Sequence, residues 1–181
     1  QPILRINGKL VPVKNGKRMN NEELTRAADE VLNDEQKVRL ERLHEVDLAL
    51  SVAGLGRFRA NVFHQRGSVE MALRVVPFGV GTIESLNLPK VIEKLADAQR
   101  GMVLVTGTTG SGKSTTLATM VERINSRRTS HIVTIEDPIE FLLKDNKSIV
   151  TQREIGQDTT SFAAGLRSAL RQDPDVIMVG E

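Results

Sequence analysis

The sequence predicts an α/β fold in two parts, a small α+β domain followed by a larger domain with a parallel sheet. Two patterns indicate this. From residue 102 onward, short apolar runs alternate with segments of helical periodicity, which is typical of parallel strands joined by covering helices. Before residue 77, acidic helix-favouring stretches precede residues that alternate between apolar and polar. We therefore divide the chain into residues 1–77, a linker at 78–88 and residues 89–181.

The first part is predicted to contain two helices and three strands. Residues 21–32 and 34–44 open on acidic residues and favour helix. Residues 47–52 alternate in polarity, and residues 57–65 and 69–76 do the same on either side of a short polar turn. We therefore expect a small α+β domain in which a further strand and a hairpin follow the two helices.

This alternation leaves arginines on the face opposite the apolar side chains. Arg57 and Arg59 share one side of their predicted strand, and Arg74 lies opposite the apolar residues of the next. That apolar set is Val69, Met71, Leu73 and Val75. A solvated sheet face is the ordinary explanation of such charges. The alternative is that some guanidinium groups meet a nucleotide's phosphates across a domain or subunit boundary.

The second part is predicted to alternate strand and helix after a glycine- and proline-containing linker that is capable of acting as a hinge. Pro89 suits the first turn of a helix, and Gly101 follows its end. The predicted strands are residues 102–105, 131–135, 148–150 and 176–179, and the predicted helices that follow are residues 113–125 and 161–171.

Composition narrows the function classes. The 181 residues are 39% hydrophobic and 27% charged, which is enough for two small cores. The net charge of +2 and the absence of Trp and Tyr argue against a dedicated nucleic-acid surface. The absence of cysteine excludes thiolate zinc sites and cysteine nucleophiles within these residues. No signal peptide or long apolar run is present, so we expect a cytoplasmic protein.

The most specific motif is a phosphate-binding loop between the strand and the helix predicted at residues 102–105 and 113–125. Its glycines let backbone amides approach phosphate oxygens without an intervening side chain. Lys113 is expected to reach the β- and γ-phosphates of a nucleotide, and the Ser114 hydroxyl is expected to bind Mg²⁺. The predicted phosphate-binding residues are Gly107, Thr108, Thr109, Gly110, Ser111, Gly112, Lys113, Ser114 and Thr115.

Two acidic strand ends complete the predicted site. Glu136 and Asp137 follow one apolar strand, and Glu181 follows another. Ligands of open α/β sheets collect at the carboxyl ends of strands, where the phosphate-binding loop also begins. A carboxylate there can hold metal-bound water or orient the attacking water. A simple turn before Pro138 is the alternative explanation for the first acidic pair.

Three blocks of sequence, residues 107–114, 134–141 and 166–181, resemble the secretion ATPase superfamily of bacterial hexameric motors. The second block resembles the aspartate box of that superfamily, and the third resembles its Walker B segment. Residues 56–67 and 151–156 are similar to the PilT branch, the type IV pilus retraction motors. The resemblance covers essentially the whole chain.

The resemblance implies a PAS-like domain hinged to a RecA-like P-loop ATPase domain, with ATP and Mg²⁺ as cofactors. Glu181 would activate water, Glu136 would assist at the metal or the water, and both would accompany Ser114 at Mg²⁺. The arginines matched to nucleotide-contacting positions are Arg59, Arg66 and Arg74. Because the chain resembles a sequence that begins inside the first domain and stops at the Walker B glutamate, we expect a fragment, and the activity of the isolated residues is open.

The resemblance also implies a homohexamer on the inner face of the cytoplasmic membrane that does not span it. Its partner would be the inner-membrane platform protein of the pilus machinery, and hydrolysis would power pilus retraction and twitching motility. Two alternatives stay open, a pilus-extension or type II secretion ATPase and a nucleotide-binding accessory subunit with little hydrolysis. A nucleic-acid motor on the same fold conflicts with the balanced charge.

Overall fold

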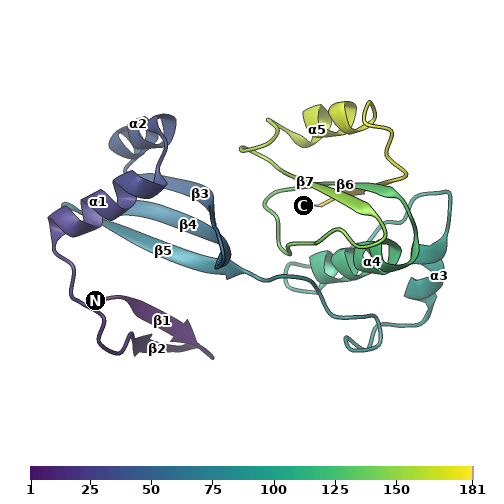
Figure 1. Cartoon of the computed structure of the whole chain (residues 1–181), viewed down its shortest axis with the longest axis horizontal. Coiled ribbons are helices and arrows are strands. Elements are labelled where there is room, and N and C mark those ends of the chain that lie inside the picture. Colours follow the sequence, from purple (N-terminus) through teal and green to yellow (C-terminus); the bar gives the residue numbers. More distant parts are fainter. Residues whose placement is uncertain (181) are drawn as a thin grey trace. The chain divides into compact units, whose positions relative to one another are not determined.

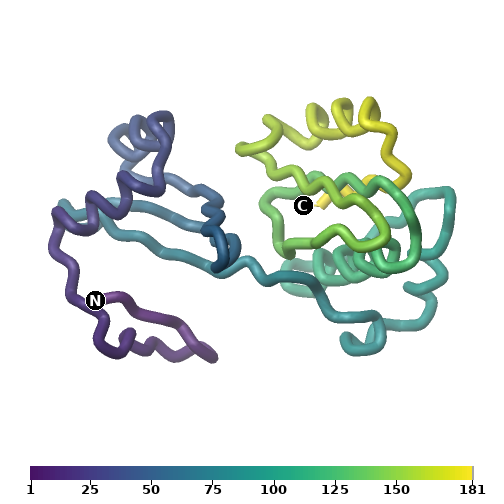
Figure 2. Tube along the Cα trace, in the orientation of Figure 1, coloured from purple at the N-terminus to yellow at the C-terminus, as the bar shows by residue number. Residues whose placement is uncertain are grey.

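The computed structural model describes residues 1–180, which fall into two compact units divided between Val75 and Val76. Figure 2 traces the order of the segments through each unit, from purple at the N-terminus to yellow at the C-terminus. Residues 78–88, predicted as the linker, belong to the second unit, where Ile83 is only 3% exposed. Each unit has its own cluster of buried apolar residues.

The first unit contains two β-sheets and two helices. A hairpin precedes α1, and a three-stranded sheet of order β3-β4-β5 follows α2. Both helices lie on one side of this sheet (Figure 1). The elements are β1 (Ile3–Ile6), β2 (Lys9–Pro12), α1 (Asn21–Val31), α2 (Asp34–Leu43), β3 (Glu45–Val52), β4 (Gly56–Gln65) and β5 (Ser68–Val76).

Asparagine residues fix the start of both helices. The Asn20 side chain accepts a hydrogen bond from Glu23 N at 2.9 Å, and the Glu23 carboxylate accepts one from Asn20 N at 3.0 Å. Asn33 and Gln36 repeat this reciprocal pair at 2.9 Å. Such capping boxes satisfy amides that a helix leaves unpaired at its first turn, so both predicted helices begin where the sequence places these caps.

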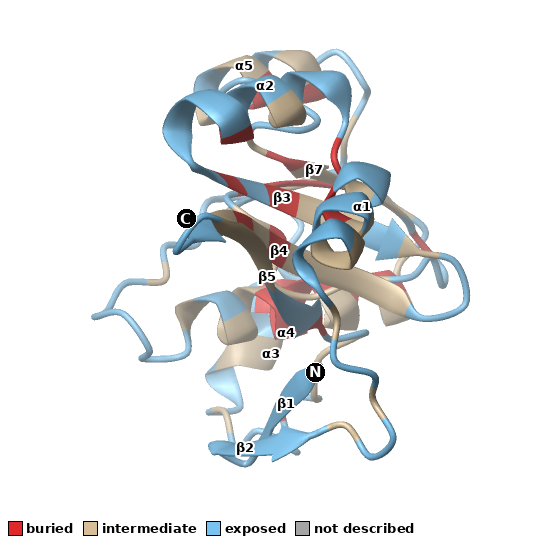
Figure 3. Ribbon diagram, turned by 90° about the vertical axis from the view of Figure 1, so that its left-hand side faces the viewer, coloured by how far each residue is buried: buried red, intermediate tan, exposed pale blue. Residues whose placement is uncertain are grey.

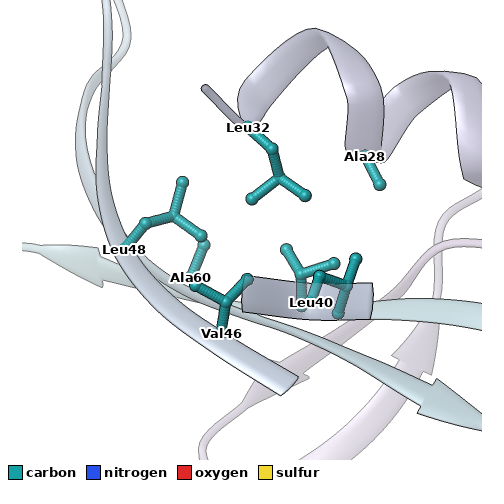
Figure 4. Packing of buried hydrophobic residues seen from close by; sticks show 7 residues of the cluster. Ala28, Leu32, Leu40, Val46, Leu48 and Ala60 are labelled. Atoms are coloured by element: carbon teal, nitrogen blue, oxygen red, sulfur yellow. The ribbon is translucent and has the colours of Figure 1, made fainter. Parts of the chain in front are cut away.

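The core of the first unit lies between the helices and the sheet. Seven buried residues form it, namely Ala28, Leu32, Leu40, Val46, Leu48, Ala60 and Val62 (Figure 4). Of the apolar set predicted on β5, Val69 and Met71 pack against this cluster. Leu73 and Val75 were expected to join it, but they are 53% and 65% exposed. The helices lie over the beginning of β5, so they leave its last residues uncovered (Figure 1).

The β1–β2 hairpin was not predicted from the sequence. Its strands pair from Ile3 with Pro12 to Ile6 with Lys9. All of its residues are exposed, as the pale blue ribbon shows (Figure 3). Because no apolar alternation toward a core marks these strands, the patterns that predicted the other strands gave no signal here.

The second unit is built on a parallel sheet of order β7-β6-β8. Its elements are α3 (Val91–Asp97), α4 (Lys113–Arg127), β6 (His131–Glu136), β7 (Ile149–Glu154), α5 (Phe162–Ala169) and β8 (Val176–Val179). β7 extends beyond the predicted residues 148–150, because polar residues from Thr151 to Glu154 continue the ladder with β6. Through residue 180, no helix has both the length and the apolar character needed to cross a bilayer.

The two faces of β6 pack against different helices. Ile132 belongs to a buried cluster with residues of α3, α4 and β8, whereas Val133 and Ile135 pack with Ala169 of α5. Helices α4 and α5 accordingly lie on opposite sides of the sheet (Figure 1). Because side chains alternate along a strand, Glu136 shares the α4 face with Ile132. This alternation places a carboxylate beneath the helix that follows the glycine-rich loop.

The strand predicted at residues 102–105 is wrong. These residues adopt neither helix nor strand, and Met102 and Leu104 are 84% and 77% exposed. A strand needs a neighbour that completes its ladder of backbone hydrogen bonds. The sheet formed by β7, β6 and β8 does not extend to residues 102–105 within the described part of the chain. The apolar run alone therefore predicted a strand that these residues do not form.

Arg123 ties α4 to α3 and gives a first testable prediction. Its guanidinium donates to both carboxylate oxygens of Asp97, at 3.0 and 2.8 Å, and lies 2.9 Å from Glu93 Oε2. The Arg123→Met variant should keep the packing of the aliphatic stem and lose about 1 kcal/mol in free energy of unfolding, because the pair is partly exposed. Urea denaturation at pH 7 measures the loss.

The same pair sets the pH dependence of that loss. The hydrogen bond from Arg123 lowers the pKa of Asp97 below its ordinary value of 3.8. The stabilisation is therefore complete above pH 3.8 and disappears as the pH falls through the lower pKa of the folded state. Arg127→Met is the control, because Arg127 is 57% exposed and lies 3.9 Å from Asp97. An equal loss of stability at pH 7 and pH 3 would contradict this account.

Candidate functional site

A cavity of about 130 Å³ lies at the start of α4, beside the carboxyl ends of β6 and β8. It brings Glu136 together with Lys113 and Ser114 of the loop, which were predicted from two separate parts of the sequence. Its volume is below the range of about 300–1,000 Å³ that is usual for small-molecule sites, so it encloses only part of a nucleotide. The lining residues are Val105, Lys113, Ser114, Leu117, Ala118, Glu136, Pro138, Glu140, Phe141, Met178, Val179 and Gly180.

The glycine-rich loop makes a tight turn into α4. Gly110 and Gly112 have φ angles of 79° and 91°, a region that favours glycine. A Cβ atom at Gly107 would lie 2.6 Å from Ser111 Oγ, so a larger residue would have to displace the Ser111 hydroxyl. Gly112 is the residue that precedes the first turn of α4. The amides of that turn and the positive end of the helix dipole make this point suitable for an anion.

Lys113 carries its charge back over the loop. Its Nζ donates hydrogen bonds to the carbonyl oxygens of Gly107 and Thr108, at 3.1 and 3.2 Å. The ammonium group is therefore held between the loop and the cavity that its side chain lines. A phosphate entering the loop would meet both this charge and the amides at the start of α4.

Glu136 is a buried carboxylate with two side-chain donors. It is 6% exposed, and its Oε1 accepts hydrogen bonds from Thr134 Oγ1 at 2.6 Å and from Gln152 Nε2 at 3.1 Å. Burial raises the pKa of Glu136, and these two hydrogen bonds act in the opposite direction. The result is an oriented acid–base group at the wall of the cavity.

The residues of the cavity fit a magnesium ion at this site. Ser114 and Glu136 supply a hydroxyl and a carboxylate oxygen to the same cavity, and Mg²⁺ prefers oxygen ligands while it keeps several waters. Clusters of three or more His, Cys, Asp or Glu side chains are absent from residues 1–180.

Sequence reasoning missed the wall that follows Glu136. Pro138, Glu140 and Phe141 line the cavity, and Ile139 N donates to Glu154 Oε2 at 3.1 Å. These residues lie in the block that was matched to the aspartate box, which was the available signal. Pro138 and Phe141 have no reactive group and shape the cavity, whereas Glu140 adds a second carboxylate to its wall.

The other predicted site residues are placed less completely. Thr108, Thr109, Gly110, Ser111 and Gly112 form the loop, and Thr115 lies in the first turn of α4. Arg59 lies on β4, Arg66 in the turn after it and Arg74 exposed on β5, all in the first unit. The cavity belongs to the second unit, and the role of these arginines stays a prediction. Glu181 lies outside the described residues.

Comparison with known proteins shows which family the chain matches. Residues 77–181 match the family model described as "Type II/IV secretion system protein". The chain is 45% identical over 180 residues to a twitching motility protein of Neisseria gonorrhoeae and covers 48% of it. It is 42% identical over 180 residues to the type IV pilus retraction ATPase PilT of Pseudomonas aeruginosa and covers 52% of it. Both alignments include 99% of this chain.

A solved structure gives the same result in three dimensions. The crystal structure of the pilus retraction motor PilT with bound ADP aligns with 99% of this chain and 52% of that chain, at a TM-score of 0.90 and 49% identity. The chain thus spans about half the length of the relatives it matches. The likeness extends over both units, including the first, which precedes the residues matched by the family model. The chain therefore belongs to the type II/IV secretion system protein family.

Proposed function

We propose that the protein is a Mg²⁺-dependent ATPase that powers type IV pilus retraction. The observation that carries this proposal is the convergence of Lys113, Ser114 and Glu136 on one cavity at the start of α4. The names of the relatives support it, since one is a retraction ATPase and another is a retraction motor solved with ADP.

The residues of this chain have separable roles in the proposed reaction. The loop amides and the start of α4 bind the phosphates, and Lys113 neutralises charge that develops on the transferred group. Glu136 accepts a hydrogen bond from the attacking water and orients it. Ser114 and Glu136 would hold Mg²⁺, which supplies further neutralisation of phosphate charge when it is bound. Glu181 as the principal water-activating residue remains a prediction.

The assembly and partners are also proposals. A homohexamer would let Arg59, Arg66 or Arg74 reach the phosphates across a domain or subunit boundary. A platform protein of the pilus machinery would receive the force at the inner face of the cytoplasmic membrane. The resemblance to retraction motors supports these statements, together with the PilT relatives that match both units.

Pilus phenotypes distinguish retraction from its alternatives. A Lys113→Ala strain should lose twitching motility and keep surface pili, because pili would still extend without being withdrawn. Loss of surface pili would instead identify an extension motor. The third possibility is tested with purified protein. If the wild type binds ATP but releases phosphate as slowly as the Lys113→Ala variant, the protein is an accessory subunit, and the enzyme proposal is wrong.

A further inference from the structure

The side-chain amide of Gln152, on β7, makes hydrogen bonds both to Glu136 and to the backbone of Phe141 and Leu143. Its Nε2 donates to Glu136 Oε1 at 3.1 Å and to the carbonyl oxygen of Phe141 at 2.9 Å. Its Oε1 accepts a hydrogen bond from Leu143 N at 2.8 Å. Because both ends of the amide are engaged, the group cannot turn without breaking contacts to the carboxylate and to the backbone together.

The residue between those two backbone contacts is held from another direction. Leu142 N donates to Pro77 O at 3.0 Å, and Gly79 N donates to Leu142 O at 2.7 Å. Phe78 and Leu142 thereby form a short parallel bridge, and Lys144 Nζ lies 5.2 Å from the centre of the Phe78 ring. Residues 141–143 are thus a strip of backbone bonded to Gln152 and to residues 77–79.

Residues 77–79, to which this strip is bonded, lie where the chain passes from the first unit to the second. They directly follow β5, the last strand of the sheet of the first unit, and stand at the beginning of the second unit. At its other end the strip reaches the cavity, because Phe141 lines it and Glu136 is bonded to the same amide of Gln152. A continuous set of hydrogen bonds therefore runs from the proposed nucleotide cavity to the segment that joins the two units.

We propose that Gln152 is a positioning residue that couples Glu136 to residues 77–79 through the strip at residues 141–143. A ligand that engages Glu136 or displaces Phe141 changes the geometry at one end of the amide. The strip then shifts as a unit, since its backbone bonds to Gln152 and to residues 77–79 alternate along three consecutive residues. The proposal rests on the proposed function, because it needs a nucleotide in the cavity.

A side chain with only a structural role would not need the third bond. Anchoring Phe141 and Leu143 already uses one donor and the acceptor of Gln152. The remaining donor reaches a buried carboxylate that has a second donor in Thr134. Thr134 donates to Glu136, whereas the bonds described for residues 141–143 go to Gln152 and to residues 77–79, so Thr134 is a matched control that separates orientation of Glu136 from coupling to the strip.

Hydrogen–deuterium exchange of the protein, with and without a non-hydrolysable ATP analogue and Mg²⁺, tests the coupling. In the wild type, the analogue should slow exchange in peptides covering residues 139–144 and 76–82. Gln152→Met should raise exchange of the first peptide about tenfold without nucleotide, because three hydrogen bonds lose their partner. It should also reduce the nucleotide response of residues 76–82 at least about fivefold. Thr134→Val should keep that response.

The outcomes separate this inference from the proposed function. A wild type that does not bind the analogue defeats the proposed function and the coupling with it. Binding of the analogue with an unchanged response of residues 76–82 in Gln152→Met overturns the coupling alone, and so does binding without any response there in the wild type. If Gln152→Met does not fold, Gln152→Asn replaces it, since its amide is one methylene shorter and cannot reach Glu136 and residues 141–143 together. The same loss of response is expected.

Discussion

Lys113→Ala should lower kcat/KM for ATP hydrolysis by about 10³-fold, the largest effect expected of any single substitution in this chain. The lysine contributes the positive charge at the mouth of the loop, and its Nζ lies within 3.2 Å of two loop carbonyls. Its removal leaves those carbonyls facing the phosphates without a neutralising group. Phosphate release and binding of a fluorescent ATP analogue measure the two consequences, slower turnover and weaker binding.

Lys147→Ala is the matched control for this experiment. Lys147 is an exposed lysine of the same unit, and it is not one of the residues that line the cavity. It should hydrolyse ATP at the wild-type rate. A Lys113→Ala variant that retains turnover within tenfold of the wild type would remove the basis of the proposed phosphate site.

Glu136→Gln should lower kcat by about 10²-fold while the affinity for nucleotide changes by only a few-fold. The substitution keeps the shape of the side chain and an oxygen that can accept from Thr134 and Gln152. It removes the carboxylate that would orient water and hold Mg²⁺. Single-turnover phosphate release together with an independent measurement of ATP affinity separates the chemical step from binding.

The same variant should be at least as stable as the wild type at pH 7. Burial raises the pKa of Glu136 in the folded state, so the stability contributed by this group is present below its ordinary pKa of 4.5 and is lost as the pH rises through the folded value. A neutral amide avoids that loss.

Glu140→Gln is the control for the effect on kcat, because it also removes a carboxylate from the cavity wall but leaves Glu136 in place. Equal loss of kcat in both variants would contradict a specific role of Glu136.

The elements that the sequence predicted well carry their determinants within a few residues. Both helices of the first unit begin at an asparagine that bonds its own third helical residue, which is a local signal. The failures depended on distant parts of the chain. Residues 102–105 are apolar enough for a strand but lack a pairing neighbour in the described structure, and β7 continues through polar residues because β6 offers it a ladder.

The site divides in the same way. The loop could be predicted because its glycines, Lys113 and Ser114 are contiguous and each has a recognisable chemical task. Gln152 could not, because its importance arises from three hydrogen bonds to residues 9, 11 and 16 positions away. A glutamine in a predicted strand gives no sign of such contacts. Tertiary bonds of this kind become visible only when the sheet and the segment after Glu136 are placed together.

In strand β6, the exact number of residues matters as much as their chemical type. Its odd and even positions serve opposite helices, with Ile132 and Glu136 on one side and Val133 and Ile135 on the other. One added or deleted residue within this strand would exchange the two series and turn the carboxylate away from the phosphate loop. A conservative substitution of Ile132 would alter packing only. A one-residue insertion or deletion in β6 would disrupt both the core and the position of Glu136.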